Sequence, residues 1–439
     1  MILRKLRDII TIGFALFAMF FGAGNLLLPP FIGLQIGDHV WITILAFGLT
    51  GILLPFLGIL SVADSGDDFN DLGHRINKNL AAILGSVIMI CIGPLIALPR
   101  TAATTFEVGV LPSFPNSHPV WTSILFFSIT WLFSIAPSKV VDLVGNILTP
   151  FLLVVLVILI GMGIANPIAK PQTDMLSLPE AFTIGFIEGY QTLDVLASVI
   201  FAGIIISATK AKGYESITEK NKVVIASGAL ATACLFFIYG GLIYLGATSD
   251  VENTDISRSA LLLHISTSIL GQYGTLAIAI GIALACLTTA IALTTAVGTF
   301  FCKLTNGKLG YKFLVTASCL VAGVLSVTGV DNIIQFAYPP LAFVYPIVIT
   351  LVLYIVIFGR FVKTKLPYVL ALIASTVIAA LNVMKILGIL HIDISAWFNY
   401  IPFFAYELGW VVPSFVFFVV GFAIDRSGNR KATSPNSRG

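Results

Sequence analysis

Charged residues are scarce in this chain. Asp, Glu, Lys and Arg make up only 10% of its 439 residues, whereas 58% are hydrophobic; an ordinary soluble domain has ~25% charged residues. The mean hydropathy is +1.01. This composition excludes a water-soluble globular protein and predicts an all-α polytopic membrane protein that contacts the lipid bilayer. The net charge of +3 is too small to favour binding of nucleic acid.

Cysteine is also rare, and no pair has the spacing of a metal or redox site. Because all five lie in or beside apolar runs, we expect them to be small buried residues: Cys91, Cys234, Cys286, Cys302 and Cys319. The chain also lacks a Gly-rich nucleotide loop, a nucleophile–histidine arrangement and loops long enough for an ATPase domain. We therefore expect no enzyme, no organic cofactor and no ATPase subunit, so that any transport draws its energy from an ion gradient.

Apolar stretches between charged or Gly/Pro-rich loops predict about twelve spans of ~17–30 residues each. They are 8–36, 40–63, 80–108, 119–136, 140–165, 181–208, 222–247, 273–302, 312–328, 334–358, 367–388 and 397–424. Residues 256–270 are shorter and contain Arg258 and His264, so we expect a re-entrant or surface helix there. Counting them as a thirteenth span would invert everything after them.

The basic residues predict the orientation. With the N-terminus inside, 20 of the 24 Lys and Arg residues fall on the inner side and three (Lys170, Arg258 and Lys385) on the outer, with Arg100 inside a span. Such an excess is typical of cytoplasmic loops. Both termini are therefore expected in the cytoplasm, and residues 426–439 are expected to form a polar tail.

The first span is broken in its middle. No charge occurs from Ile9 to Gly37, yet Gly22-Ala23-Gly24-Asn25 lies at the centre and Pro29-Pro30 follow. Gly and Pro weaken a helix, and irregular backbone at membrane depth is tolerated only where it lines a cavity or is buried in protein. A broken membrane helix indicates the binding site of a transporter.

The sixth span is interrupted too, by the polar block from Glu188 to Asp194. Breaks in the first and sixth spans are typical of a five-plus-five inverted repeat, although two unrelated kinks are the simpler alternative. The prediction is one transmembrane domain over 1–425, with repeats at 8–165 and 181–358 and two extra helices over 367–424.

An unwound helix offers two kinds of partner. Its outer half begins with amides whose positive dipole end can hold a carboxylate. Its inner half ends in unpaired carbonyls, which suit a cation such as Na⁺. One break can therefore bind an amino-acid carboxylate and a sodium ion together.

Four segments resemble the bacterial branched-chain amino acid carriers, which are leucine/isoleucine/valine:cation symporters. They are GFALFAMFFGAGNLLLPPFIG (13–33), GPLIALPRTAATTFEVG (93–109), GFIEGYQTLDVLAS (185–198) and ACLTTAIALTTAVGTFF (285–301), and the resemblance covers roughly 1–425. It implies the leucine-transporter fold and sodium-coupled uptake of leucine, isoleucine and valine across the bacterial inner membrane.

The resemblance also implies site residues. The superfamily's Gly-x-Gly-Asn break matches Gly22 to Asn25, so the amides of Ala23 and Gly24 would meet the substrate carboxylate. The carbonyls of Ala18 and Phe21 would face a sodium ion.

Helix 8 would complete that sodium site. The superfamily's pattern of one carbonyl and two hydroxyls matches Ala285, Thr288 and Thr289, which share one helix face and supply the oxygen ligands that a hard ion prefers. The alternative is that these threonines only back-bond or pack between helices. A second pair, Thr294 and Thr295, lies closer to the inner end.

Other polar residues have open alternatives. Asn25 could give its side-chain oxygen to a sodium ion or could satisfy the broken backbone. Glu188 and Asp194 could relay protons, bind an amine, or form a structural ion pair or helix cap. We expect Gly189, Tyr190 and Gln191 to wall the substrate site.

The outer gate is where this chain departs from the sodium:amino-acid symporters, because Leu28 stands where some of them have Arg. Arg100 is a candidate substitute, paired with Glu107 or Glu188; its alternative is to extend to the outer headgroups.

The function expected from all of this is import of branched-chain amino acids with a cation, Na⁺ rather than H⁺. One alternative is a proton-coupled or exchange carrier for another amino acid or a nucleobase-like solute on the same fold. A channel or a solute sensor is the other.

Overall fold

The structure is a computed structural model that describes residues 2–67, 69–74, 76–135, 139–173, 176–251, 255–389 and 400–432. Within these residues all regular structure is helical. In chain order the α-helices are α1 (Ile2–Phe20), α2 (Ala23–Ile36), α3 (Val40–Gly48), α4 (Leu54–Ser65), α5 (Lys78–Ile90), α6 (Ala97–Thr104), α7 (Pro119–Ile135), α8 (Lys139–Ala165), α9 (Leu178–Glu188), α10 (Asp194–Ala211), α11 (Ile217–Ala247), α12 (Arg258–Leu304), α13 (Tyr311–Ser326), α14 (Val330–Phe358), α15 (Leu366–Ile386) and α17 (Val411–Ala432). Short π-helical turns are η1 (Leu49–Leu53), η3 (Cys91–Leu95) and η4 (Thr105–Val110), and 3₁₀ turns are η2 (Phe69–His74), η5 (Gly189–Thr192) and η6 (Phe404–Tyr406).

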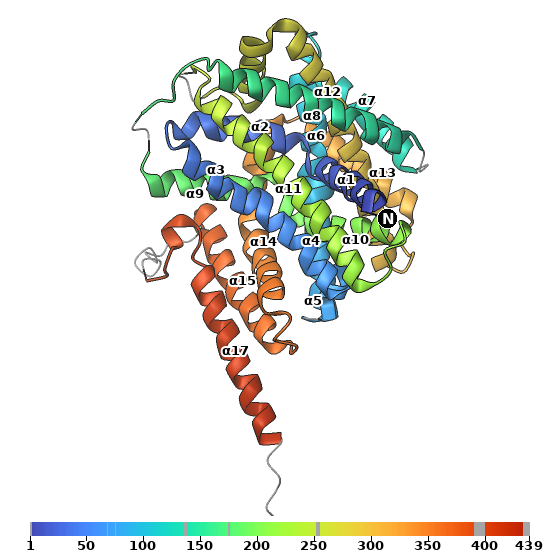
Figure 1. Cartoon of the computed structure of the whole chain (residues 1–439), viewed down its shortest axis with the longest axis vertical. Coiled ribbons are helices and arrows are strands. Elements are labelled where there is room, and N and C mark those ends of the chain that lie inside the picture. Colours follow the sequence, from blue (N-terminus) through green and yellow to red (C-terminus); the bar gives the residue numbers. More distant parts are fainter. Residues whose placement is uncertain are drawn as a thin grey trace, which may run out of the picture.

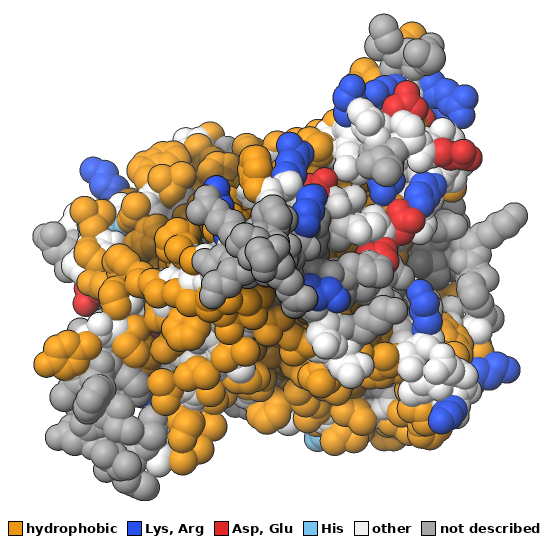
Figure 2. All heavy atoms as spheres, turned by 90° about the horizontal axis from the view of Figure 1, so that it is seen from below, with side chains coloured by type: hydrophobic (Ala, Val, Ile, Leu, Met, Phe, Trp, Pro, Cys, Tyr) orange, Lys and Arg blue, Asp and Glu red, His pale blue; other side chains and the backbone are white. Residues whose placement is uncertain are grey.

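The outer surface is largely apolar, as a protein that lies in lipid requires. Trp41, Trp121, Val324 and Phe361 are between 73% and 82% exposed. Figure 2 shows hydrophobic side chains over most of one face, with the charged side chains gathered toward one side. Seven described helices are long and apolar enough to cross a membrane, or eight if α1 and α2 count as one span. The chain is therefore an integral membrane protein.

Two predicted boundaries need correction and one is confirmed. The first helix begins at Ile2 rather than at residue 8. The short helix predicted over 256–270 is separate from the span predicted over 273–302, because Gly271 (φ 67°, ψ −173°) breaks α12 between them. The last helix begins at Val411 rather than at residue 397 and continues to Ala432, into the segment predicted as a polar tail. Residues 397–399 and 433–439 lie outside the described residues.

Two predicted spans contain π-helical turns that the sequence did not reveal. The span predicted over 40–63 contains η1, and that over 80–108 contains η3 and η4. Within η3 Gly93 is non-helical (φ −91°, ψ −120°) and Pro94 follows. A π-helical turn shifts the face that the next helix presents, so η3 sets the direction of α6 and of Arg100 on it.

The core is built around α2, in which 12 of 14 residues are buried. α11 lies beside both α1 and α2, and α12 packs against α2, α6 and α8 (Figure 1). Backbones approach closely where glycines meet: a Cβ on Gly33 would lie 2.0 Å from the carbonyl oxygen of Ile243, and one on Gly246 would lie 1.9 Å from that of Pro30. Small residues at such crossings are the usual way in which membrane helices pack.

The last helices form a separate edge. α15 packs against α14 and α17, and α17 extends beyond the rest of the molecule at the bottom of Figure 1. The breaks at η3 and η5 lie among α2, α6 and α10 instead, whereas η6 precedes α17.

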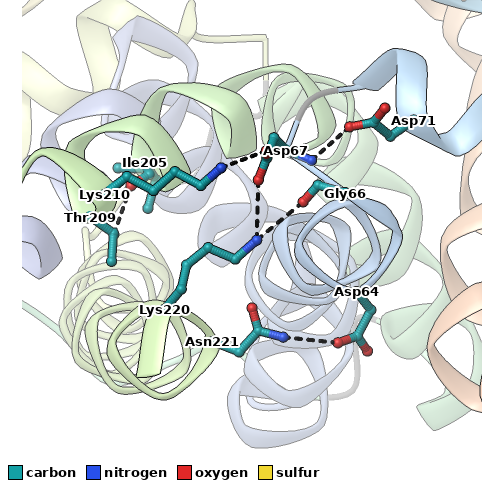
Figure 3. A network of polar contacts seen from close by, with 9 residues as sticks. All are labelled: Asp64, Gly66, Asp67, Asp71, Ile205, Thr209, Lys210, Lys220 and Asn221. Carbon is teal, nitrogen blue, oxygen red and sulfur yellow. Dashed lines mark hydrogen bonds and ion pairs between the residues drawn. The ribbon is translucent and has the colours of Figure 1, made fainter. Parts of the chain in front are cut away.

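Three charged residues and one backbone carbonyl at the ends of three helices form a network. We call it the Asp67 cluster, and its members are Gly66, Asp67, Lys210 and Lys220 (Figure 3). Asp67 follows α4 and accepts hydrogen bonds from Lys210 Nζ at 2.6 Å, at the end of α10, and from Lys220 Nζ at 3.2 Å, near the start of α11. Lys220 also donates to the carbonyl of Gly66 at 3.4 Å. The bond from Lys210 holds the pKa of the Asp67 carboxyl below its usual value.

Candidate functional site

The first break leaves two carbonyls without their helical donors. α1 and α2 meet at an angle of 70°. The Gly22 N–H donates to the Phe20 carbonyl (2.9 Å), and the Asn25 N–H donates to the Gly22 carbonyl (3.2 Å). In an unbroken helix these donors would reach Ala18 and Phe21. The two carbonyls predicted as sodium ligands are therefore among those that the break frees.

The same break exposes two amides. Ala23 and Gly24 are the first residues of α2, and across the described chain no acceptor is found for either N–H. The start of α2 is thus the positive end of a helix, and it faces the gap in the first span, as the sequence predicted.

The second break lies in α9–η5–α10. α9 ends at Glu188, η5 covers Gly189–Thr192, and Leu193 takes a left-handed conformation (φ 67°) before α10 begins at Asp194. Thr192 stabilises the turn, because its hydroxyl donates to the Gly189 carbonyl (2.8 Å) and accepts from the Asp194 N–H (3.3 Å). Both spans in which the sequence predicted a break are thus broken.

Asn25 joins the two breaks. Its Nδ2 donates to the Phe20 carbonyl (2.7 Å) and to Asp194 Oδ2 (2.8 Å), and it contacts the Tyr239 hydroxyl. Tyr239 also donates to Asp194 Oδ2 at 3.3 Å. Of the two roles predicted for Asn25, these contacts match satisfaction of the broken backbone; a sodium ligand role for its oxygen stays a prediction.

Arg100 differs from its predicted pairing. Its Nη1 donates to the Gln191 carbonyl (2.7 Å), and its side chain is buried, with 2% exposure. No ion pair joins it to Glu107 or Glu188, which are both described. Arg100 lies instead over the first break: a Cβ added to Gly24 would be 2.6 Å from Nη2. It is thus neither paired as expected nor extended toward headgroups.

A small cavity lies between the two breaks. Its volume is about 40 Å³, far below the ~300–1,000 Å³ of typical ligand pockets, so its walls must separate to admit an amino acid. It is lined by Met19, Phe20, Gly22, Ala23, Gly24, Asn25, Ile92, Ala97, Arg100, Thr101, Thr192, Leu193, Asp194, Ala197, Phe201, Thr289 and Leu293. The lining combines the exposed amides, one cation and one carboxylate with apolar walls.

Helix α12 approaches the break through Thr289. A Cβ on Gly22 would lie 3.5 Å from Thr289 Cγ2, so this threonine touches the unwound segment. The Thr288 hydroxyl donates to the Ala285 carbonyl at 2.9 Å, which is the back-bonding that was the alternative to a sodium role. Ala285 and Thr288 do not line the cavity. Whether these three residues bind an ion stays a prediction.

The second break places its polar block differently from the expectation. Gly189, Tyr190 and Gln191 are buried but do not line the cavity. Tyr190 stacks on Tyr345, with 4.5 Å between the ring centroids. Gly189 packs against Thr50, because a Cβ there would lie 2.0 Å from Thr50 Oγ1. Near the cavity, the backbone of Gln191 serves as the acceptor for Arg100.

Several cavity residues were missed from the sequence. Thr192 and Leu193 directly follow the predicted residues. Ala197 and Phe201 follow Asp194 at i+3 and i+7, which is the spacing of one helix face and was the available signal. The contributions of Ile92 and Ala97 depend on the bend in η3, which had no signal.

The two glutamates lie outside the cavity. Glu107 accepts the Val330 N–H (2.9 Å) and the Ser259 hydroxyl, and so joins η4 to the starts of α12 and α14. Glu188 is half-buried, and its buried Oε2 has no hydrogen-bond partner in the described part of the chain. Gating by either residue stays a prediction.

Comparisons with known proteins cover nearly the whole chain. A family model described as "Branched-chain amino acid transport protein" matches residues 5–428. The branched-chain amino acid permease BraB of Bacillus subtilis is 35% identical over 427 residues, which cover 95% of each chain. The branched-chain amino acid transport system 3 carrier protein of Pseudomonas aeruginosa is 33% identical over 429 residues, 96% of this chain and 97% of that one.

Solved structures share the fold. The inward-facing conformation of Mhp1 superposes with a TM-score of 0.61 at 11% identity, covering 95% of this chain and 91% of that one. A Na⁺-coupled sialic acid symporter in its substrate-bound outward-open state gives a TM-score of 0.55 at 13% identity, covering 93% and 88%. At such identities the likeness establishes the architecture alone: an all-helical transporter fold.

Proposed function

The chain belongs to the branched-chain amino acid transport protein family, which makes it a transporter rather than an enzyme, and from this premise we propose that it imports leucine, isoleucine and valine, driven by a Na⁺ gradient. The observation that carries the proposal is the first break: a 70° bend that frees carbonyls at the end of α1 and amides at the start of α2. Such a break can hold a carboxylate and a cation at once.

The proposed substrate site uses the start of α2. The amides of Ala23 and Gly24 would bind the α-carboxylate, with Asn25 holding the break in shape through Asp194. The second break, with Gly189, Tyr190 and Gln191 as its backbone, would form the facing wall. Apolar residues such as Phe201 and Leu293 would accept the branched side chain, since each buried CH₂ group contributes ~0.8 kcal/mol.

The proposed sodium site lies on the other side of the break. The carbonyls of Ala18 and Phe21 would be joined by the Ala285 carbonyl and the hydroxyls of Thr288 and Thr289 from α12. The contact of Thr289 with Gly22 supports this arrangement. It is also supported by the Na⁺ coupling of the sialic acid symporter whose structure superposes on this chain.

We also propose the finer architecture: twelve spans, a five-plus-five inverted repeat over 8–165 and 181–358, and both termini in the cytoplasm of a bacterial cell. Breaks in the first span and in the sixth support the repeat, because an offset of five spans turns the second unit upside down. Alternating access would then open the cavity to either side in turn.

Uptake by purified protein in proteoliposomes tests the proposal. We expect radiolabelled leucine to accumulate when an inward Na⁺ gradient is imposed and to stop when a Na⁺ ionophore dissipates it. Accumulation driven by a pH gradient without Na⁺ would favour the proton-coupled alternative, for which the carboxylates of Asp194 and Glu188 are the candidate carriers. Absence of leucine uptake under both gradients would contradict the proposed function.

A further inference from the structure

Arg100 is a buried cation that makes no direct ion pair among the described residues. It is 2% exposed, its one hydrogen bond runs from Nη1 to the Gln191 carbonyl, and no carboxylate lies within 4 Å of its guanidinium among the residues described. A guanidinium has five N–H donors, and burying an unpaired charge is costly. The guanidinium of Arg100 therefore has donors left with which it can bind an anion.

The guanidinium and the start of α2 face the same space. Arg100 Nη2 would lie 2.6 Å from a Cβ on Gly24, and both residues line the cavity. The unpaired amides of Ala23 and Gly24 point from the positive end of a 14-residue helix. Two independent positive features therefore converge on one point, and guanidinium groups bind carboxylates in a fixed forked geometry.

A carboxylate lines the same cavity. Asp194 is 3% exposed, and its hydrogen bonds from Asn25 and Tyr239 both go to Oδ2, so its carboxyl group keeps acceptor capacity for a further donor. Asp194 and Arg100 lie more than 4 Å apart, so they do not neutralise each other directly. The cavity thus presents one unpaired positive and one negative group, the pattern that complements a zwitterion.

We propose that Arg100 binds the α-carboxylate of the amino-acid substrate together with the amides of Ala23 and Gly24, and that Asp194 binds its α-ammonium group. This deepens the proposed function and rests on it. The two residues make the site selective for free amino acids over amines and fatty acids with the same side chain. The gating role first considered for Arg100 is replaced by a binding role.

Competition binding tests this assignment. Purified wild type, Arg100→Gln and Asp194→Asn are titrated with radiolabelled leucine at saturating Na⁺. Unlabelled L-leucine, L-leucinol (no carboxylate) and 4-methylpentanoate (no amine) then serve as competitors. Arg360→Gln, which removes an exposed arginine after α14, is the matched control.

Each variant is expected to lose preference for one group only. Arg100→Gln should lower leucine affinity by roughly 10- to 100-fold, the effect of a hydrogen bond to a charged group, while leucinol binding is unchanged. Asp194→Asn should lower leucine affinity by a similar factor, while 4-methylpentanoate binding is unchanged. Arg360→Gln should match wild type in every titration.

Equal weakening of all three ligands in Arg100→Gln would overturn the proposal, because a purely structural arginine has no reason to distinguish them. Arg100→Lys covers the case in which Arg100→Gln does not fold. Its retained charge should keep the preference for leucine over leucinol, and a folded Arg100→Lys without that preference would also overturn the proposal. Wild type that fails to bind leucine at all would instead contradict the proposed function.

Discussion

Gly24 is the residue at which the site is most tightly constrained. Its main chain starts α2, its N–H is unpaired, and the Arg100 guanidinium lies where a side chain would be. A glycine at the start of a helix ordinarily matters for backbone freedom, but here the lack of a Cβ matters for the space between an amide and a cation.

Gly24→Val should therefore abolish leucine binding without preventing membrane insertion, because the added side chain displaces Arg100 and covers the amides. Radioligand binding to protein purified as a monodisperse peak checks this. Gly161→Val on α8 is the control, since nothing lies within 4 Å of a Cβ there. Normal leucine affinity in Gly24→Val would count against a carboxylate site at this break.

Single residues were predictable where they belong to a local pattern. The break at Gly22 to Asn25 follows from backbone propensity and membrane depth. The partner of Arg100 did not follow, because a position in a helix fixes a face only when the helix is regular, and the non-helical Gly93 in η3 redirects α6. Phe201 could have been predicted, because it lies seven residues after Asp194 on the same face of α10.

At the scale of elements, the breaks in the first and sixth spans were predictable and the π-helical turns were not. Gly, Pro and polar blocks marked the interruptions of the first and sixth spans. The π-helical turns η1 and η4 contain no proline, and each adds only one residue to a helical turn, so no break is evident in the sequence there. The start of the last helix was missed because apolar residues continue through the turns before Val411.

The Asp67 cluster joins the ends of α4, α10 and α11, so Asp67→Asn should destabilise these elements relative to one another. Each partly exposed pair contributes about 1 kcal/mol or less, since Asp67 is 55% exposed and Lys210 is 42% exposed. The effect is measured as the midpoint of thermal unfolding in detergent. Asp64→Asn, which alters only a 3.3 Å bond from Asn221, is the control and should change less.

The stability difference between wild type and Asp67→Asn should also depend on pH. Because the Asp67 pKa is below its ordinary value of 3.8, its contribution to stability is present above pH 3.8 and disappears as the pH falls through the lowered pKa. The difference between wild type and Asp67→Asn should be constant near neutrality and shrink in acid. A difference that grows as the pH falls would rule out the cluster as described.

At the scale of the whole molecule, the sequence predicted the class of fold because scarcity of charge and long apolar runs leave few alternatives in lipid. The number of spans and their direction depend on how the segment around Gly271 is counted. The break at Gly271 separates a short helix from a long one, but the hydrophobic pattern cannot say on which side of the membrane the short one lies.

Labelling from one side of the membrane tests the predicted orientation. In a cysteine-free background, Lys170→Cys should react with an impermeant maleimide added outside whole cells, and Lys308→Cys should react only after permeabilisation. Both lysines are exposed in the structure. Labelling of Lys308→Cys from outside would mean that residues 256–270 form a thirteenth span, and the inner and outer sides of the second half would exchange.

The central claim is that one helix break holds the solute and the ion together, so each must strengthen the binding of the other. The most direct test is the dissociation constant of leucine for purified protein as a function of Na⁺ concentration, in wild type, in Thr288→Ala plus Thr289→Ala, and in Thr376→Ala, which removes a back-bonded hydroxyl on α15 far from the break. We predict that Na⁺ lowers the constant in wild type and in Thr376→Ala, and that the double variant needs roughly 10-fold more Na⁺ for the same affinity. A leucine dissociation constant that does not change with Na⁺, or a double variant with the Na⁺ dependence of wild type, would contradict the account.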